Sequence, residues 1–238
     1  MSSEEYSSFY MQYGIGAFET MRLEDGRVAL KEYHLRRLLK FGEKWNVDES
    51  ILKEAFEACL EKKTKTRARL KVWIGLHHDK SIKTHLYELP LEAKPILNKV
   101  LCIEVSFNKE QAYKSCNYED HFFALQQAKQ KGYDNVCYKM NGKLLEFATG
   151  SVLLKSGQKG ILSEGPALDS VSARKLSSHE SWSYGTVSLN QLKDADFMMS
   201  NAVFGIMPVK ELYDEEGGLL YKNKREVCVS DLDQFMFS

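Results

Sequence analysis

Glu146 is a single carboxylate inside an otherwise apolar run, KLLEFATGSVLL, which begins directly after Asn141-Gly142. An Asn-Gly pair between two apolar segments strongly indicates a tight β-hairpin, so Glu146 is expected in the returning strand. A charged side chain in an apolar strand is costly to bury unless it meets an opposite charge or a strong donor. Glu146 therefore needs a partner, and the candidates are Lys114 and a protonated nitrogen of a bound cofactor.

Strand and helix patterns alternate along the whole chain. The sequence predicts a hairpin at Asp25-Gly26, helices over 31–44 and 119–131, and a half-buried strand over 68–74. Pro90 and Pro95 interrupt both kinds of pattern and indicate a connection between domains. We therefore expect a small α/β domain over 1–92 and a larger domain over 93–238.

Composition excludes several classes of protein. The 238 residues contain 33 basic and 33 acidic side chains, so no net charge favours nucleic acid or an anionic membrane. The five cysteines are scattered, which argues against disulfides and zinc and fits a reducing compartment. The first residues lack a signal-peptide pattern, and no apolar run is long enough to span a bilayer. We expect a cytoplasmic protein.

Four short motifs have an order of residues that packing alone does not explain. They are YGIGAFETMR at 13–22, HLRRL at 34–38, KSCNY at 114–118 and LKDADFMMSNAVFGIMPV at 192–209. Taken alone, HLRRL is typical of a solvated basic helix face, and KSCNY contains an ordinary surface lysine. Their order, with Glu146 after a helix and a hairpin, makes the combination specific.

These motifs resemble those of the class IV aminotransferases, the pyridoxal-phosphate enzymes of fold type IV. The family includes branched-chain aminotransferases, D-amino acid aminotransferases and aminodeoxychorismate lyases. The resemblance extends from Tyr13 to Val209 and implies an α+β, two-domain fold like that of D-amino acid aminotransferase. The larger domain would be β-barrel-like and would bind the cofactor, and relatives form homodimers.

The resemblance implies roles for individual residues. Lys114 would bind the cofactor aldehyde covalently and move protons as a general acid and base. Glu146 would keep the pyridine nitrogen protonated, so that the ring can accept electrons from the substrate. The cofactor phosphate would be bound by Arg37, through its planar guanidinium fork, and by Val171, Ser172, Asn201 and Ala202.

The sequence also departs from the family pattern. Ser151 stands where most members have an asparagine, and the phosphate loop matches poorly at SEGPALDSVSAR, residues 163–174. Tyr13 and Phe18 match aromatic residues that line the substrate side. Leu76 stands where many members, lyases included, have an arginine for the substrate carboxylate, and His77 is a candidate replacement.

Three functions are consistent with these motifs. The first is 4-amino-4-deoxychorismate lyase, which makes 4-aminobenzoate and pyruvate in folate biosynthesis. The second is a branched-chain or D-amino acid aminotransferase that uses 2-oxoglutarate. The third is a catalytically silent relative, although the presence of both Lys114 and Glu146 argues against it.

Overall fold

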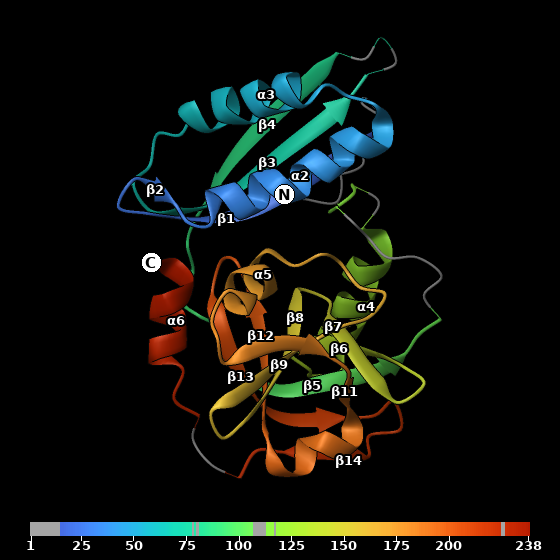
Figure 1. Cartoon of the computed structure of the whole chain (residues 1–238). Helices are drawn as coiled ribbons and strands as arrows, with labels where there is room; N and C mark the ends of the chain where they lie inside the picture. The colour runs from blue at the N-terminus through green and yellow to red at the C-terminus, as the bar shows by residue number, and fades with distance from the viewer. Residues whose placement is uncertain (1–14, 78, 80, 107–112, 117, 225–226) are drawn as a thin grey trace. The chain divides into compact units, whose positions relative to one another are not determined.

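The computed structural model of the chain describes residues 15–238 except 78, 80, 107–112, 117, 225 and 226. The chain forms two compact units, Met1–Glu92 with Gln111–Tyr118, and Ala93–Glu110 with Glu119–Ser238 (Figure 1). The segment that carries Lys114 thus folds with the first unit, although it follows the first strand of the second unit along the chain.

The first unit is a four-stranded antiparallel sheet, in the order β2-β1-β3-β4, with helices α2 and α3 on one face (Figure 1). Its elements are β1 (Ile15–Glu24), β2 (Arg27–Val28), α2 (Lys31–Trp45), α3 (Glu49–Glu61), β3 (Ala68–Leu76) and β4 (Ile82–Leu89).

Local sequence signals account for this arrangement. Asp25 and Gly26 have φ of 50° and 74°, which is the left-handed geometry of a tight hairpin turn. Asp48 caps α3 by accepting a hydrogen bond from Ser50 N at 2.7 Å. Alternate residues of β1 and β3 face the helices and build a buried core with them, among them Ala17, Met21, Leu23, Leu70, Val72, Leu35, Leu38 and Phe41.

The second unit contains a ten-stranded sheet and three α-helices among the described residues. Its strands are β5 (Leu97–Glu104), β6 (Asn135–Met140), β7 (Lys143–Phe147), β8 (Gly150–Ser156), β9 (Lys159–Ser163), β10 (Trp182–Gly185), β11 (Val187–Ser188), β12 (Asp196–Asn201), β13 (Gly205–Tyr213) and β14 (Leu219–Lys222). Its helices are α4 (Glu119–Gln130), α5 (Val171–Ser177), α6 (Ser230–Phe237) and the 3₁₀ helix η1 (Leu189–Asp194).

Six of these strands close into a barrel. The order β8-β12-β13-β5-β6-β7 returns to β8 through the pairing of β7 with β8. The predicted hairpin at Asn141-Gly142, with φ of 52° and 74°, joins β6 to β7 and positions Glu146 in β7. The larger unit is therefore barrel-like within an α+β fold, as the resemblance implies.

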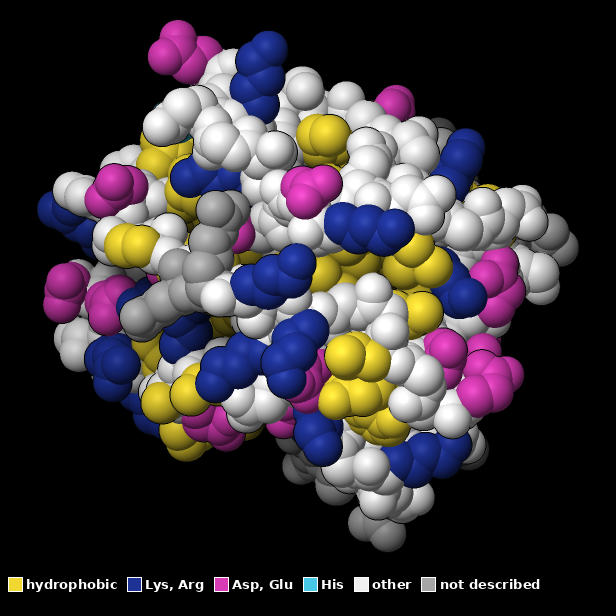
Figure 2. Space-filling view, turned by 90° about the horizontal axis from the view of Figure 1, so that it is seen from below, with side chains coloured by type: hydrophobic (Ala, Val, Ile, Leu, Met, Phe, Trp, Pro, Cys, Tyr) yellow, Lys and Arg dark blue, Asp and Glu magenta, His cyan; other side chains and the backbone are white. Residues whose placement is uncertain are grey.

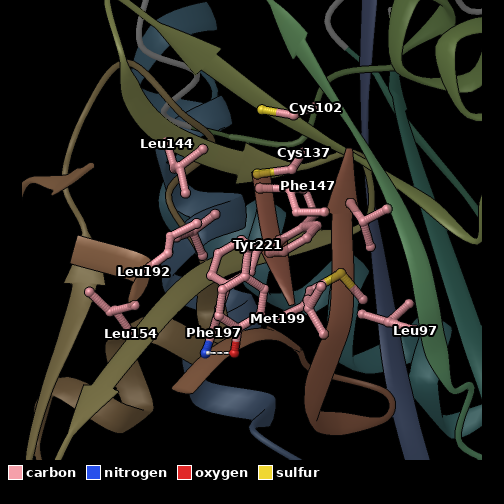
Figure 3. Close-up of a cluster of buried hydrophobic side chains, with 14 of the residues drawn as sticks. Leu97, Cys102, Cys137, Leu144, Phe147, Leu154, Leu192, Phe197, Met199 and Tyr221 are labelled. Atoms are coloured by element: carbon pink, nitrogen blue, oxygen red, sulfur yellow. Dashed lines mark hydrogen bonds between the residues drawn. The ribbon is translucent and has the colours of Figure 1, made fainter. Parts of the chain in front are cut away.

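A cluster of buried side chains fills the barrel (Figure 3). Phe147 and Phe197 stack with ring centroids 5.5 Å apart, and Tyr221 meets Phe197 edge-on at 5.7 Å. The Tyr221 hydroxyl accepts a hydrogen bond from Phe197 N at 3.4 Å, so its polar end has a partner inside the core. This core fixes the strands from which Glu146, Ser151 and Ser200 project.

Two details of the helices do not follow from apolar residue type alone. Phe122 and Phe123 are apolar residues of α4, but they are 48% and 57% exposed, because the helix packs on β6 through Ala128. In the C-terminal part of the chain that the structure describes, β14 joins the sheet and residues 230–237 form α6.

Charged side chains are mixed on the molecular surface. On the face seen in Figure 2, Lys and Arg side chains lie among Asp and Glu side chains and small apolar patches, in keeping with a formal net charge of zero. Within the part of the chain that the structure describes, no helix has both the length and the apolar character to cross a bilayer.

Candidate functional site

A buried acid holds two basic side chains in the first unit. Glu19 projects from β1 toward α2, where its carboxylate accepts hydrogen bonds from Arg37 Nε at 2.7 Å and from Arg37 Nη2 at 2.5 Å. The His34 Nδ1 atom lies 2.6 Å from Glu19 Oε2. All three side chains are at most 8% exposed. Arg37 is therefore held bidentately in one orientation, which fixes the direction of its guanidinium fork.

Electrostatics determine the protonation of this cluster. Burial alone would raise the pKa of the Glu19 carboxyl, but the Arg37 charge and the His34 hydrogen bond outweigh it and hold the pKa at about 2. Burial lowers the pKa of His34, and the positive charges of Arg37 and Lys114 lower it further. His34 is thus neutral at pH 7 and donates its Nδ1 proton to Glu19, while its buried Nε2 has no partner among the described residues.

The backbone of Lys114 is attached to the edge of β1. Phe18 N donates to Lys114 O at 2.9 Å, and Cys116 N donates to Gly16 O at 3.0 Å. Ala17 and Ser115 form an antiparallel bridge between these two bonds. Residues 16–18 of the YGIGAFETMR motif and residues 114–116 of the KSCNY motif, about a hundred residues apart in the sequence, therefore lie side by side in the first unit.

The side chain of Lys114 is half-buried against aromatic rings. Its Nζ lies 4.7 Å from the ring centroid of Phe18 and 5.1 Å from that of Tyr118. Because the Lys114 charge also lowers the pKa of His34, the lysine lies within electrostatic reach of the Glu19 cluster. The first unit thus contains three of the residues singled out from the sequence, with Lys114 beside Phe18 and with Arg37 bound to Glu19 on the helical side of the sheet.

A second group of polar residues lies on the outer side of the barrel. Glu146 on β7, Ser151 on β8 and Ser200 on β12 are neighbours in register, so their side chains share one face of the sheet. Glu146 is 7% exposed, and its carboxylate accepts a hydrogen bond from Leu168 N at 3.3 Å. Burial raises the pKa of Tyr138, and the negative charge of Glu146 raises it further.

A chain of hydroxyl groups lies beside this row. Ser172 Oγ is 3.0 Å from Ser200 Oγ and 3.1 Å from Ser170 Oγ. Ser172 and Ser200 are at most 1% exposed, and Val171 is buried at the start of α5. Although loop 163–174 matches the family poorly, it places hydroxyl groups next to the strand that carries Ser200.

The turn between β12 and β13 is held by two acceptors. Asn201 Oδ1 accepts from Val203 N at 3.0 Å and from Phe204 N at 2.8 Å, and Asp233 Oδ1 accepts from Ile206 N at 2.8 Å. Gly205 has φ of 76°, and an added Cβ would collide with Asp233. These contacts explain the spacing of Asn201 and Gly205 in the motif, and they fix the backbone at Ala202.

The other residues predicted to line the substrate side are Tyr13 and His77. Tyr13 lies outside the described residues. His77 follows β3, and its Nδ1 lies 3.9 Å from Asp79 Oδ1. Leu76, which stands where many relatives have an arginine, packs into the buried core beneath the helices. Lys114 and Arg37 belong to the first unit, while Glu146, Ser151, Ser172, Asn201 and Ala202 belong to the second.

Sequence reasoning missed Glu19, although the signal for it is the same as for Glu146. Glu19 is a carboxylate at an inward position of the alternating strand Ala17, Glu19, Met21, where burial demands a positively charged or strong hydrogen-bonding partner. The HLRRL motif contains that partner. No group of three or more potential metal ligands occurs in the described part of the chain.

Comparison with known proteins identifies what this arrangement is similar to. Residues 16–212 match the family model described as amino-transferase class IV. None of the curated proteins searched matches the chain significantly.

Three solved structures illustrate the similarity in fold. A hypothetical aminotransferase from Mycobacterium tuberculosis in its PLP-bound form has a TM-score of 0.74 at 17% identity, covering 96% of this chain and 89% of its own. The 4-amino-4-deoxychorismate lyase from Pseudomonas aeruginosa has a TM-score of 0.72 at 17% identity, and the match covers 94% of this chain and 91% of the lyase. The branched-chain amino acid aminotransferase of Escherichia coli has a TM-score of 0.74 at 19% identity, and the match covers 94% of this chain and 85% of the aminotransferase.

Proposed function

This chain belongs to the class IV aminotransferase family, and we propose that within the family it is a 4-amino-4-deoxychorismate lyase. Membership makes it an enzyme that depends on pyridoxal 5′-phosphate. The cofactor, when bound, supplies an aldehyde for the substrate amine and a ring that accepts electrons from the substrate carbon. We further propose that the protein is a cytoplasmic homodimer.

The donor set of the chain fits this cofactor. Lys114 is a half-buried lysine, and its amine is the group that can react with the cofactor aldehyde. Glu146 is a buried carboxylate, which suits a protonated pyridine nitrogen. We assign the phosphate to Arg37, Ser172 and the backbone of Val171, Asn201 and Ala202, with Ser151 beside Glu146. Phe18, Tyr13 and His77 are assigned to the substrate side.

In this assignment the residues of the chain perform distinct tasks. Lys114 accepts a proton from the substrate carbon and returns a proton to the product, as a general base and then a general acid. The Glu146 carboxylate holds a proton at the pyridine nitrogen through its negative charge. Arg37, oriented by Glu19, binds a phosphate oxygen through its guanidinium.

The lyase assignment is carried by Leu76. A transaminase must bind two carboxylate substrates in turn at the same site, and an arginine at this position would serve both. Here a leucine packs into the core instead, so less positive charge is available at that end of β3. A lyase binds one substrate at this site and not two in turn, so another residue that holds a single substrate carboxylate is sufficient. The branched-chain or D-amino acid aminotransferase is the alternative.

Product analysis separates these two functions. The protein, loaded with pyridoxal phosphate, is given 4-amino-4-deoxychorismate without any keto acid, and pyruvate is followed by a coupled dehydrogenase. We expect equal amounts of pyruvate and 4-aminobenzoate. The opposite result would show that the protein is an aminotransferase. In that case aminodeoxychorismate yields no pyruvate, and a branched-chain or D-amino acid transfers its amino group only when 2-oxoglutarate is present.

Replacement of Arg37 by lysine tests the phosphate assignment. Lysine keeps the positive charge that Glu19 requires but lacks the bidentate fork, so we expect cofactor affinity to fall about tenfold. Affinity is measured by titrating the apoprotein with pyridoxal phosphate and following its visible absorbance. The control is urea unfolding, which should have the same midpoint in Arg37→Lys as in the wild type. If the cofactor affinity of such a correctly folded variant is unchanged, Arg37 does not bind the phosphate.

A further inference from the structure

One face of the first unit's sheet carries aromatic rings together with positive charge. Phe18 on β1 and Trp73 on β3 are cross-strand partners, and their rings stack with centroids 5.7 Å apart. Lys71 is two residues before Trp73, so both side chains leave the strand on the same side. We call Phe18, Lys71, Trp73, Lys114 and Tyr118 the Phe18 face.

Two ammonium groups share the central ring of this face. Lys71 Nζ lies 4.6 Å from the ring centroid of Phe18 and 4.7 Å from that of Trp73. Lys114 Nζ lies 4.7 Å from the centroid of the same Phe18 ring. Lys71 is therefore close to the residue that we assign to the cofactor aldehyde.

Lys71 lacks the partner that a half-buried ammonium normally has. No carboxylate in the described part of the chain forms an ion pair with it, and its contacts are aromatic rings. Burial, opposed by the nearby Cys116 and assisted by the Arg69 charge, lowers the pKa of Lys71 to about 8. Desolvating an ammonium without a counter-charge is unfavourable, so an anion at this face would be stabilised.

We propose that Lys71, whose ammonium lies over the buried rings of Phe18 and Trp73, binds the carboxylate of a substrate. The ammonium would donate charge-assisted hydrogen bonds to the carboxylate, and the rings would hold the lysine side chain in place. Identifying this anion with the substrate of the enzyme rests on the proposed function, but the anion site itself does not.

Leu76 and His77, the two residues at the end of β3, are less suitable than Lys71 for binding a substrate carboxylate. The side chain of Leu76 belongs to the core on the helical side of the sheet, opposite the Phe18 face. His77 has the Asp79 carboxylate 3.9 Å from its Nδ1, and that negative charge would repel a second carboxylate. Lys71 has neither drawback.

The test is the binding of benzoate and of its neutral analogue benzamide to the purified protein. Binding is followed by tryptophan fluorescence, because Trp73 contacts Lys71, and by calorimetry. The variants are Lys71→Met and Lys71→Arg, with Lys83→Met as the matched control on the exposed part of β4 and His77→Gln for the competing position. Each preparation is also treated with pyridoxal phosphate and borohydride, and the label on Lys114 is measured.

We expect benzoate to bind more tightly than benzamide, and Lys71→Met to weaken benzoate binding about tenfold to a hundredfold. Lys71→Arg, Lys83→Met and His77→Gln should stay close to wild type. No preference for benzoate, or equal benzoate affinity in Lys71→Met and Lys83→Met, would overturn the anion site. Absence of the Lys114 label would instead overturn the proposed cofactor role, and the benzoate titration would still decide on Lys71.

Discussion

Replacing Lys114 with alanine is expected to abolish turnover and the covalent attachment of pyridoxal phosphate. The substitution removes both the amine that binds the aldehyde and the group that moves protons. General acid–base catalysis alone contributes about 10²–10⁴-fold, so activity should fall by at least that factor. Turnover is measured with saturating cofactor, and the covalent label is mapped by mass spectrometry after borohydride reduction.

The fold should survive this change. The Lys114 carbonyl oxygen accepts a hydrogen bond from Phe18 N, and the neighbouring Cys116 N donates to Gly16 O, so alanine preserves both backbone bonds. Urea unfolding of the apoprotein should therefore stay close to wild type. Activity in Lys114→Ala equal to that of the wild type would disprove the catalytic assignment, whatever the product.

Glu146→Ala is the informative contrast to this variant. It removes the carboxylate that stabilises a protonated pyridine nitrogen, but it leaves Lys114 in place. We expect the borohydride label on Lys114 to be retained, while proton abstraction from the substrate slows. Solvent deuterium exchange at the substrate carbon measures this step. Loss of the label in Glu146→Ala, with normal exchange in the remaining holoenzyme, would contradict the division of roles.

The elements around these residues follow signals that act over short distances in the sequence. Asp25-Gly26 and Asn141-Gly142 form the predicted turns because few other residues adopt positive φ without strain. Asp48 begins α3 because its side chain accepts a backbone N–H. Turns and helix caps of this kind depend on a few neighbouring residues and can be predicted from the sequence. The functional roles of Lys114 and Glu146 come from the motifs alone and stay predictions.

The environment of Arg37 could not be predicted in the same way. Arg36 and Arg37 both look like residues of a solvated helix face, yet Arg37 is 6% exposed because Glu19 of β1 lies opposite it. That partner is 18 residues away and on another element, so helical periodicity contains no information about it. Lys71 likewise follows an ordinary alternating strand pattern, and only packing shows that its neighbours are aromatic rings.

Glu19→Ala is expected to have the largest effect on stability. Removal of one partner from a buried ion pair leaves an uncompensated charge, here that of Arg37, and typically costs about 3–5 kcal/mol. The Nδ1 proton of His34 loses its acceptor as well. The free energy of unfolding in urea should fall by this amount at pH 7. The matched control is Thr20→Ala, at the next position of the same strand and on the opposite face of the sheet.

Acidification provides an independent measure of the same interaction. The pKa of Glu19 is lowered from 4.5 to about 2, and a lowered carboxyl pKa stabilises the fold above the unfolded-state pKa. At about 1.4 kcal/mol per pKa unit this contribution is about 3 kcal/mol at neutral pH. It should be lost progressively as the pH falls from about 4.5 toward 2.

The pH dependence also separates Glu19 from its histidine partner. Burial lowers the pKa of His34 in the folded protein below its ordinary value of 6.5. The fold therefore begins to lose stability when the pH falls through about 6.5, where the histidine of the unfolded chain takes up a proton. The loss of stability caused by protonation of Glu19 begins at lower pH, near 4.5. Urea unfolding of wild type and Glu19→Gln is compared at several pH values. The stability difference should be constant between pH 7 and 5 and should shrink below 4.5. A difference that stayed constant into the acid range would mean that Arg37 is stabilised by other groups, and Glu19 would then not be what orients it.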